Sequence, residues 1–82
     1  MKHRIEIYGI RGCLTCTNAR KFAELHKLDF EYICMSLDPS QVQVMKDKAE
    51  ITGNCSAPQI FVDDDHLGGF VEFKRWLRSQ TA

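Results

Sequence analysis

The sequence has no excess of charge of either sign, since its 11 Lys and Arg residues balance 11 Asp and Glu residues. A chain without a net positive charge has no long-range attraction to nucleic acid or to an anionic membrane surface. This balance therefore argues against nucleic acid and against a membrane as partners.

Long apolar runs are absent as well. The charged residues at the start of the chain are not followed by the continuous apolar stretch of a signal peptide or a membrane-spanning helix. Repeats, linkers and low-complexity tracts are also missing, and 82 residues can bury only one modest core. We therefore expect a single domain over residues 1–82, monomeric and located in the cytoplasm.

The four cysteines include only one close pair, Cys13 and Cys16. A structural zinc site normally uses two close pairs of ligands, but Cys34 and Cys55 stand apart and the histidines are scattered. A disulfide framework is disfavoured too, because it belongs to secreted chains and no export signal is present. The close pair is then catalytic or metal-binding, and the missing second pair makes metal the weaker interpretation.

The spacing of apolar residues predicts an α/β chain with the element order β-α-β-α-β-β-α. Residues 4–8 alternate polar and apolar side chains as a strand does, and apolar positions recur at helical spacing from Cys13 to His26. Residues 30–35 predict a second strand, which the intervening helix places parallel to the first.

The next segment has the signals of a helix start. Asp38 is expected to be the N-cap, Pro39 the first helical residue and Gln41 the partner in a capping box. Gly53 is expected to end this helix in a left-handed conformation.

The last third of the chain predicts a hairpin and a helix. Residues 59–62 and 66–68 are expected to be its strands, joined by a turn of three aspartates at 63–65. Aromatic residues at helical spacing after Gly69 predict the final helix. Together these elements predict a four-stranded mixed sheet flanked by three helices.

The position of the cysteine pair suggests redox chemistry. If a helix begins near Cys13, unpaired backbone N–H groups and the positive end of the helix dipole favour its thiolate, the form that attacks disulfides. Cys16 lies one turn deeper on the same side and can close a disulfide with Cys13. A purely structural bridge is disfavoured, because so short a loop restricts the unfolded chain little. We therefore expect Cys13 to attack and Cys16 to resolve.

The sequence also resembles a known family. A CxxC pair after the first strand of a βαβ chain is typical of the thioredoxin superfamily. Residues 56–62, residues 66–70 and Glu72 resemble the glutaredoxin pattern of a proline-led strand, a hairpin and a double-glycine turn into the last helix. With Tyr8-Gly9 and Gly12-Cys13 added, the resemblance covers nearly the whole chain and points to a dithiol glutaredoxin.

This resemblance implies a thioredoxin fold and a glutathione-dependent thiol-disulfide oxidoreductase. Such a protein reduces protein disulfides and glutathione mixed disulfides, with glutathione as co-substrate, no metal and no tightly bound cofactor. A ribonucleotide reductase disulfide is one client that the family suggests.

The resemblance also implies a glutathione site. Pro58 would be a cis-proline facing the disulfide, the backbone of Ala57 would pair with an extended thiol peptide, and free N–H groups after Gly69 would receive a carboxylate. Glu72 would face the ammonium group of glutathione, or would simply be an acidic residue favourable in a first helical turn. The implied binding residues are Arg11, Thr15, Ala57, Pro58, Gly69, Phe70, Val71 and Glu72.

Several residues depart from the family pattern. Leu14-Thr15 replaces the Pro-Tyr common in dithiol glutaredoxins, and Val71 stands where a hydroxyl residue is frequent. Arg11 either adds positive charge near the thiolate or only solvates the turn. These departures keep two alternatives open: a glutaredoxin-like redoxin reduced by thioredoxin reductase, and an iron-sulfur cluster carrier, whose usual single-cysteine motif is altered here by Cys16.

Overall fold

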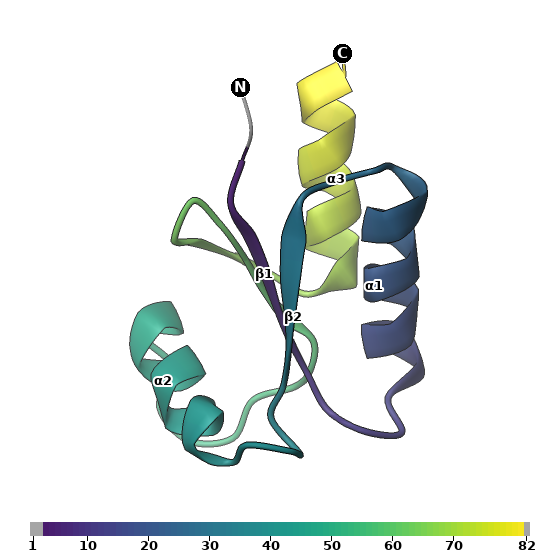
Figure 1. Ribbon diagram of the computed structural model, residues 1–82. Coiled ribbons are helices and arrows are strands. Elements are labelled where there is room, and N and C mark those ends of the chain that lie inside the picture. Colours follow the sequence, from purple (N-terminus) through teal and green to yellow (C-terminus); the bar gives the residue numbers. More distant parts are fainter. Residues whose placement is uncertain (1–2, 82) are drawn as a thin grey trace.

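The computed structural model describes residues 3–81, and its elements follow the predicted order. They are β1 (Ile5–Gly9), α1 (Leu14–Leu25), β2 (Phe30–Cys34), α2 (Ser40–Ala49), β3 (Gln59–Val62), β4 (Asp65–Gly68) and α3 (Phe70–Thr81) (Figure 1). The sheet has the order β2-β1-β3-β4, in which β1 runs parallel to β2 and antiparallel to β3, and β3 runs antiparallel to β4. The predicted mixed sheet with three helices is therefore confirmed.

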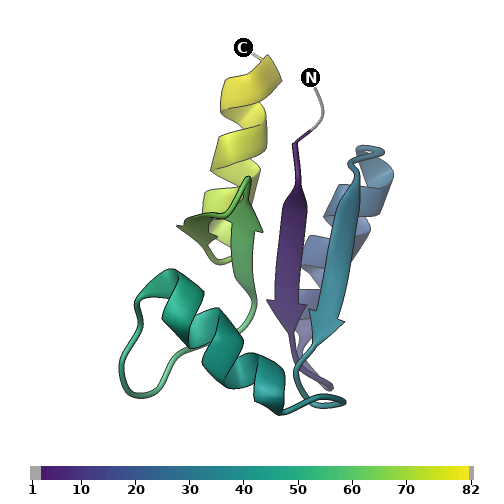
Figure 2. The same ribbon diagram turned by 60° about the vertical axis from the view of Figure 1, so that its left-hand side comes forward.

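The helices form layers on both faces of the sheet. Figures 1 and 2 show α1 and α3 together on one face and α2 alone on the other. Side chains of β1 alternate between these layers: Ile5 and Ile7 join the core under α1 and α3, while Tyr8 joins the core under α2. Every residue of β1 is buried, as expected for a central strand covered on both faces.

The start of α2 differs slightly from the prediction. The N-cap is Pro39 and the first helical residue is Ser40, one position later than predicted, while the Asp38 carboxylate accepts hydrogen bonds from the backbone N–H and the hydroxyl of Ser40. The Gln41 side chain donates to the same carboxylate at 3.4 Å instead of accepting from the Asp38 backbone, so the reciprocal capping box does not form.

The end of α2 corrects the prediction for Gly53. The left-handed residue after the helix is Glu50 (φ 57°, ψ 40°), and the Ile51 N–H donates to the Lys46 carbonyl at 2.9 Å. This is a Schellman motif, and it turns Ile51 into the core beneath the helix. Gly53 has a positive φ of 82°, but it lies in the loop beyond. Burial of Ile51 therefore ends the helix before the glycine is reached.

The predicted turn of three aspartates contains two. Asp63 and Asp64 have φ of 52° and 68°, as in a two-residue hairpin turn, while Asp65 already belongs to β4 and faces Val62. Asp63 also accepts the backbone N–H of Arg4 at 2.9 Å, which fastens the turn to the start of β1. Asp63 thus has a structural partner in β1.

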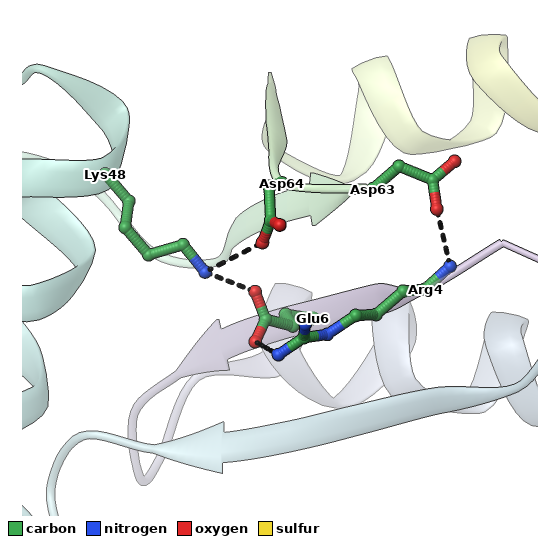
Figure 3. A network of polar contacts seen from close by, with 5 residues as sticks. All are labelled: Arg4, Glu6, Lys48, Asp63 and Asp64. Atoms are coloured by element: carbon green, nitrogen blue, oxygen red, sulfur yellow. Dashed lines mark hydrogen bonds and ion pairs between the residues drawn. The ribbon is translucent and has the colours of Figure 1, made fainter.

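A buried ion pair fixes α2 on the sheet (Figure 3). The Glu6 carboxylate on β1 accepts a hydrogen bond from Lys48 of α2 and lies 3.5 Å from Arg4 Nη2. Lys48 Nζ also lies 3.6 Å from Asp64 Oδ1 and 4.9 Å from the centre of the Phe61 ring. Burial lowers the pKa of Lys48, but the contacts with Glu6 and Tyr8 together outweigh it, and the pKa rises above its ordinary value.

Within residues 3–81, no helix has the length and apolar character needed to cross a membrane.

Candidate active site

The loop after β1 places Cys13 at the start of α1, as predicted. Cys13 is the N-cap, and its Sγ accepts the backbone N–H of Cys16 at 3.1 Å. The helix itself begins with the Thr17 N–H bonded to the Cys13 carbonyl at 3.1 Å. A sulfur in this position lies at the positive end of the helix dipole, which favours negative charge on it. Cys13 is half-buried and is therefore reachable by a substrate.

Cys16 lies on the buried side of the same turn and has no exposed surface. Burial raises the pKa of Cys16 to about 11, and its hydrogen bond with Cys13 adds to the increase. Contacts with the Ile10 backbone and the Tyr32 hydroxyl act in the opposite direction. Cys16 thus keeps its proton at neutral pH while Cys13 occupies the helix N-terminus, and the division into an attacking and a resolving thiol stays a prediction.

This difference predicts the order of alkylation. At pH 7 we expect iodoacetamide to modify Cys13 and the exposed Cys55 of the reduced protein, while Cys16 stays unmodified because it is buried and protonated. Below its pKa, modification of Cys16 should rise about tenfold per pH unit, because the thiolate is the reacting form. Peptide mass mapping after timed quenching measures all three rates. Equal labelling of Cys16 and Cys13 at pH 7 would contradict the assignment.

The segment before β3 reaches the attacking sulfur. The Ala57–Pro58 peptide bond is cis, as the resemblance implied, and Cys13 Sγ donates to the Ala57 carbonyl at 3.8 Å. The Gln59 side chain donates to the Ser56 carbonyl at 2.7 Å and holds the loop. The Ala57 backbone is therefore next to Cys13.

The double glycine brings the start of α3 to the same place. Gly68 has a φ of 123°, a conformation that L side chains rarely adopt, and a Cβ there would lie 3.0 Å from Glu72 Oε1. A Cβ on Gly69 would lie 3.7 Å from the Pro58 carbonyl oxygen, so this corner adjoins the cis-proline.

The carboxylate of Glu72 caps its own helix. Its Oε1 accepts the backbone N–H of Gly69 at 2.8 Å, a contact typical of an acidic residue at the third position of a helix. Glu72 therefore engages the N–H of Gly69 itself, whereas the expected carboxylate site involves the N–H groups after Gly69 and stays a prediction. The N–H groups of Phe70 and Val71, in the first turn, have no acceptor within the helix itself.

The remaining predicted residues lie further out. The Arg11 backbone N–H donates to the Ser36 hydroxyl at 3.0 Å, and its side chain lines a cavity of about 770 Å³ at the outer side of β2. Thr15 and Val71 are exposed, as is Leu14, with 74% of its surface accessible. The structure thus brings together Cys13, Ala57, Pro58 and Gly69, and leaves the other predicted residues around them.

Neither metal nor a further catalytic cluster emerges from the described residues. Between residues 3 and 81, no group of three or more His, Cys, Asp or Glu side chains is placed to hold a metal ion. One residue near the cysteines was missed by the sequence analysis: Tyr32 of β2, whose hydroxyl acts to lower the pKa of Cys16. Its pattern in the sequence indicated only a strand.

Known proteins resemble this chain in sequence and in fold. A family model described as Glutaredoxin matches residues 5–67. Glutaredoxin 1 of Escherichia coli K12 is 31% identical over 77 residues, which cover 88% of this chain and 89% of the relative.

Solved structures of related proteins have the same fold as this chain. The reduced glutaredoxin of Escherichia coli has a TM-score of 0.78 at 27% identity, covering 93% of this chain and 94% of that chain. NrdH-redoxin of Escherichia coli, a glutaredoxin-like protein with a thioredoxin-like activity profile, has a TM-score of 0.66 at 25% identity, covering 82% and 83%. The fold is therefore the thioredoxin fold. With a family match that spans both the CxxC pair and the cis-proline strand, the chain belongs to the glutaredoxins and is a thiol-disulfide oxidoreductase.

Proposed function

We propose that this protein takes its electrons from glutathione and reduces protein disulfides and glutathione mixed disulfides, as a monomer in the cytoplasm. The observation that carries the proposal is the junction of Cys13 with the Ala57 backbone and the start of α3. An extended thiol peptide would pair with the Ala57 backbone while its carboxylate reaches the first N–H groups of α3. A ribonucleotide reductase disulfide is one candidate client.

The proposed cycle needs only thiols. The Cys13 thiolate attacks one sulfur of the client disulfide, whose S–S bond breaks, and the other client sulfur leaves as a thiolate and takes up a proton. Cys16 then attacks Cys13 and releases the client, which leaves a Cys13–Cys16 disulfide. One glutathione thiolate opens this disulfide by forming a mixed disulfide, and a second removes the first as glutathione disulfide.

A second candidate differs in its electron donor. In this case thioredoxin reductase would reduce the Cys13–Cys16 disulfide directly. The likeness to NrdH-redoxin favours it, as does the engagement of the Glu72 carboxylate by the Gly69 N–H. The exposed apolar side chains of Leu14 and Val71 also favour it, because they offer no hydrogen bond to a peptide ligand.

The two donors can be compared directly. Reduction of a small mixed disulfide is followed through NADPH consumption, once with glutathione and glutathione reductase, and once with thioredoxin reductase. We expect turnover only in the first mixture, with Cys13→Ser as the blank. Turnover only with thioredoxin reductase would overturn the proposal and leave the second candidate.

A matched variant tests the glutathione site in the same assay. Glutamine at position 72 keeps the capping contact to Gly69 but removes the charge that would face the glutathione ammonium group. Glu72→Gln should therefore raise KM for the glutathione mixed disulfide by about 5-fold, the loss of one exposed charge contact of about 1 kcal/mol. An unchanged KM would mean that Glu72 serves only as a cap.

A further inference from the structure

Two consecutive hydrogen bonds connect β4 to the loop before the cis-proline. His66 Nε2 lies 2.7 Å from Gln59 Oε1, and Gln59 Nε2 donates to the Ser56 carbonyl at 2.7 Å. Gln59 is the first residue of β3 and only 7% of its surface is exposed. His66 belongs to β4 and lies opposite Phe61 in the antiparallel register, with the two ring centres 5.1 Å apart. The connection therefore runs from an exposed histidine, through a buried amide, to the backbone of the loop.

The orientation of the Gln59 amide determines which atom of His66 carries a proton. A carbonyl oxygen can only accept a hydrogen bond, so the amide must turn its Nε2 toward Ser56. Its Oε1 then faces His66 and needs a donor there, which is the Nε2–H of the imidazole. The reverse orientation of the amide would place two acceptor oxygens against each other. The donor on His66 thus selects the one orientation of the amide that binds Ser56.

The Gln59 side chain depends on these two contacts. Among residues 3–81, His66 and Ser56 are the only hydrogen-bond partners of this amide. Because Gln59 is buried, the loss of one partner would leave a polar atom unsatisfied in the interior. Without the donor from His66, the amide therefore has no reason to stay aligned with the Ser56 carbonyl.

The loop that Gln59 holds carries the backbone next to the attacking sulfur. Residues 52–57 form neither helix nor strand, so regular structure does not fix them. Ser56 directly precedes Ala57, whose carbonyl oxygen lies 3.8 Å from Cys13 Sγ. The hydrogen bond from Gln59 to Ser56 therefore fixes the chain one residue before this contact.

We propose that His66 is a positioning residue for substrate binding, in which its Nε2–H fixes the Gln59 amide and, through it, the Ala57 backbone. A loop that is already held in place does not need to be ordered when the substrate binds, and this raises affinity. The inference rests on the proposed pairing of an extended thiol peptide with Ala57, and not on the identity of the electron donor. His66 acts through Gln59, so it affects the affinity for the substrate and not the reactivity of Cys13.

The test measures substrate affinity and thiol reactivity separately. The substrate is an extended peptide with one disulfide that releases a fluorophore on reduction, and dithiothreitol is the reductant. KM and kcat are measured for the parent and each variant, and alkylation of Cys13 by iodoacetamide is timed by peptide mass mapping without substrate. Because dithiothreitol replaces the natural donor, the outcome does not depend on whether glutathione or thioredoxin reductase supplies the electrons.

His66→Phe should raise KM by about 3- to 10-fold, because it keeps a ring against Phe61 but has no N–H to donate. The net effect of one hydrogen bond is about a 2- to 12-fold change in an equilibrium constant, which sets this range. Both kcat and the alkylation rate of Cys13 should stay within about twofold of the parent, as expected for a loss of uniform binding. His66→Gln, whose amide N–H can donate to the same oxygen, should restore KM to within about twofold.

Gln59→Leu tests whether His66 acts through this amide. The substitution removes both hydrogen bonds, so KM should rise as it does in His66→Phe. The double variant should have the KM of Gln59→Leu alone, because the two residues belong to one connected set of contacts. A KM in the double variant that equals the product of the two separate increases would overturn the proposal, since His66 would then act independently of Gln59.

His3→Phe is the matched control. His3 also contacts an aromatic ring, that of Trp76 at 5.1 Å, and its Nδ1 lies 2.7 Å from Asp63 Oδ2. It precedes β1, at the opposite end of this strand from the cysteines. Neither KM nor the alkylation rate should change in this variant.

The remaining outcomes separate this inference from the proposed function. An unchanged KM in His66→Phe together with a raised KM in Gln59→Leu would overturn the inference alone. An unchanged KM in both variants would overturn it together with the proposed pairing of the substrate at Ala57. Alkylation of Cys13 that slows by the same factor as KM rises would also overturn it, because His66 would then have a general structural role.

Discussion

A Cys13→Ser variant should lose disulfide reduction by at least about 10³-fold, because a serine hydroxyl is not ionised at neutral pH and cannot form a mixed disulfide. Cys16→Ser should keep the first attack and lose the resolution of protein disulfides. Reduction of insulin with dithiothreitol as the electron donor measures both variants without assuming the natural donor. Cys55→Ser, an exposed cysteine in a loop, should retain full activity.

The pattern of these variants distinguishes the possible nucleophiles. Residual activity in Cys13→Ser close to that of the parent would assign the attack to another thiol. Loss of activity in Cys55→Ser would mean that the loop before the cis-proline takes part in the chemistry. Parent-like activity of Cys13→Ser is not compatible with the N-cap position of Cys13 as the origin of reactivity.

Phe73→Ala should lower the free energy of unfolding by about 3–5 kcal/mol, the usual cost of truncating a buried phenylalanine. Phe73 is fully buried, and its ring packs edge-on against Phe22 at 5.4 Å and stacks with Trp76 at 6.1 Å. For a chain of this size, the loss corresponds to a decrease in Tm of about 12–40 °C. Thermal unfolding monitored by circular dichroism measures it.

An exposed residue of the same helix provides the control for this substitution. Arg75→Ala on the outer side of α3 should change the free energy of unfolding by less than about 0.5 kcal/mol. A Tm for Phe73→Ala within a few degrees of the parent would contradict the packing of α3 on the sheet.

The elements of the fold were predictable because their signals are local. The alternating side chains of residues 4–8 predicted a strand and the helical spacing after Cys13 predicted a helix, and both elements were confirmed, although every residue of β1 proves to be buried. The end of α2 was not predictable from local signals. Glycine is the residue that most often adopts the left-handed conformation after a helix, so Gly53 was the expected position. The core contact of Ile51 instead places this conformation at Glu50, and the packing of Ile51 offsets the steric cost of a side chain there.

The same distinction applies to the site. The roles expected for Cys13 and Cys16 follow from spacing and the helix dipole, which act within one turn. Glu72 could be read in two ways from sequence, and only the structure shows its contact with Gly69. Tyr32 was missed because the position of its hydroxyl beside Gly9 depends on the parallel register of β1 and β2. The signal available in the sequence was Gly9, because a glycine at the end of a buried strand can leave space for a neighbouring side chain.

The central claim is that Cys13 is the attacking sulfur, and trapping its mixed disulfide tests this most directly. Cys16→Ser protein is incubated with glutathione disulfide, quenched with acid and mapped by peptide mass spectrometry. The account predicts one glutathione per chain, attached to Cys13, with Cys34 unmodified. Glutathione attached to Cys34 or Cys55 while Cys13 remains a free thiol would contradict it.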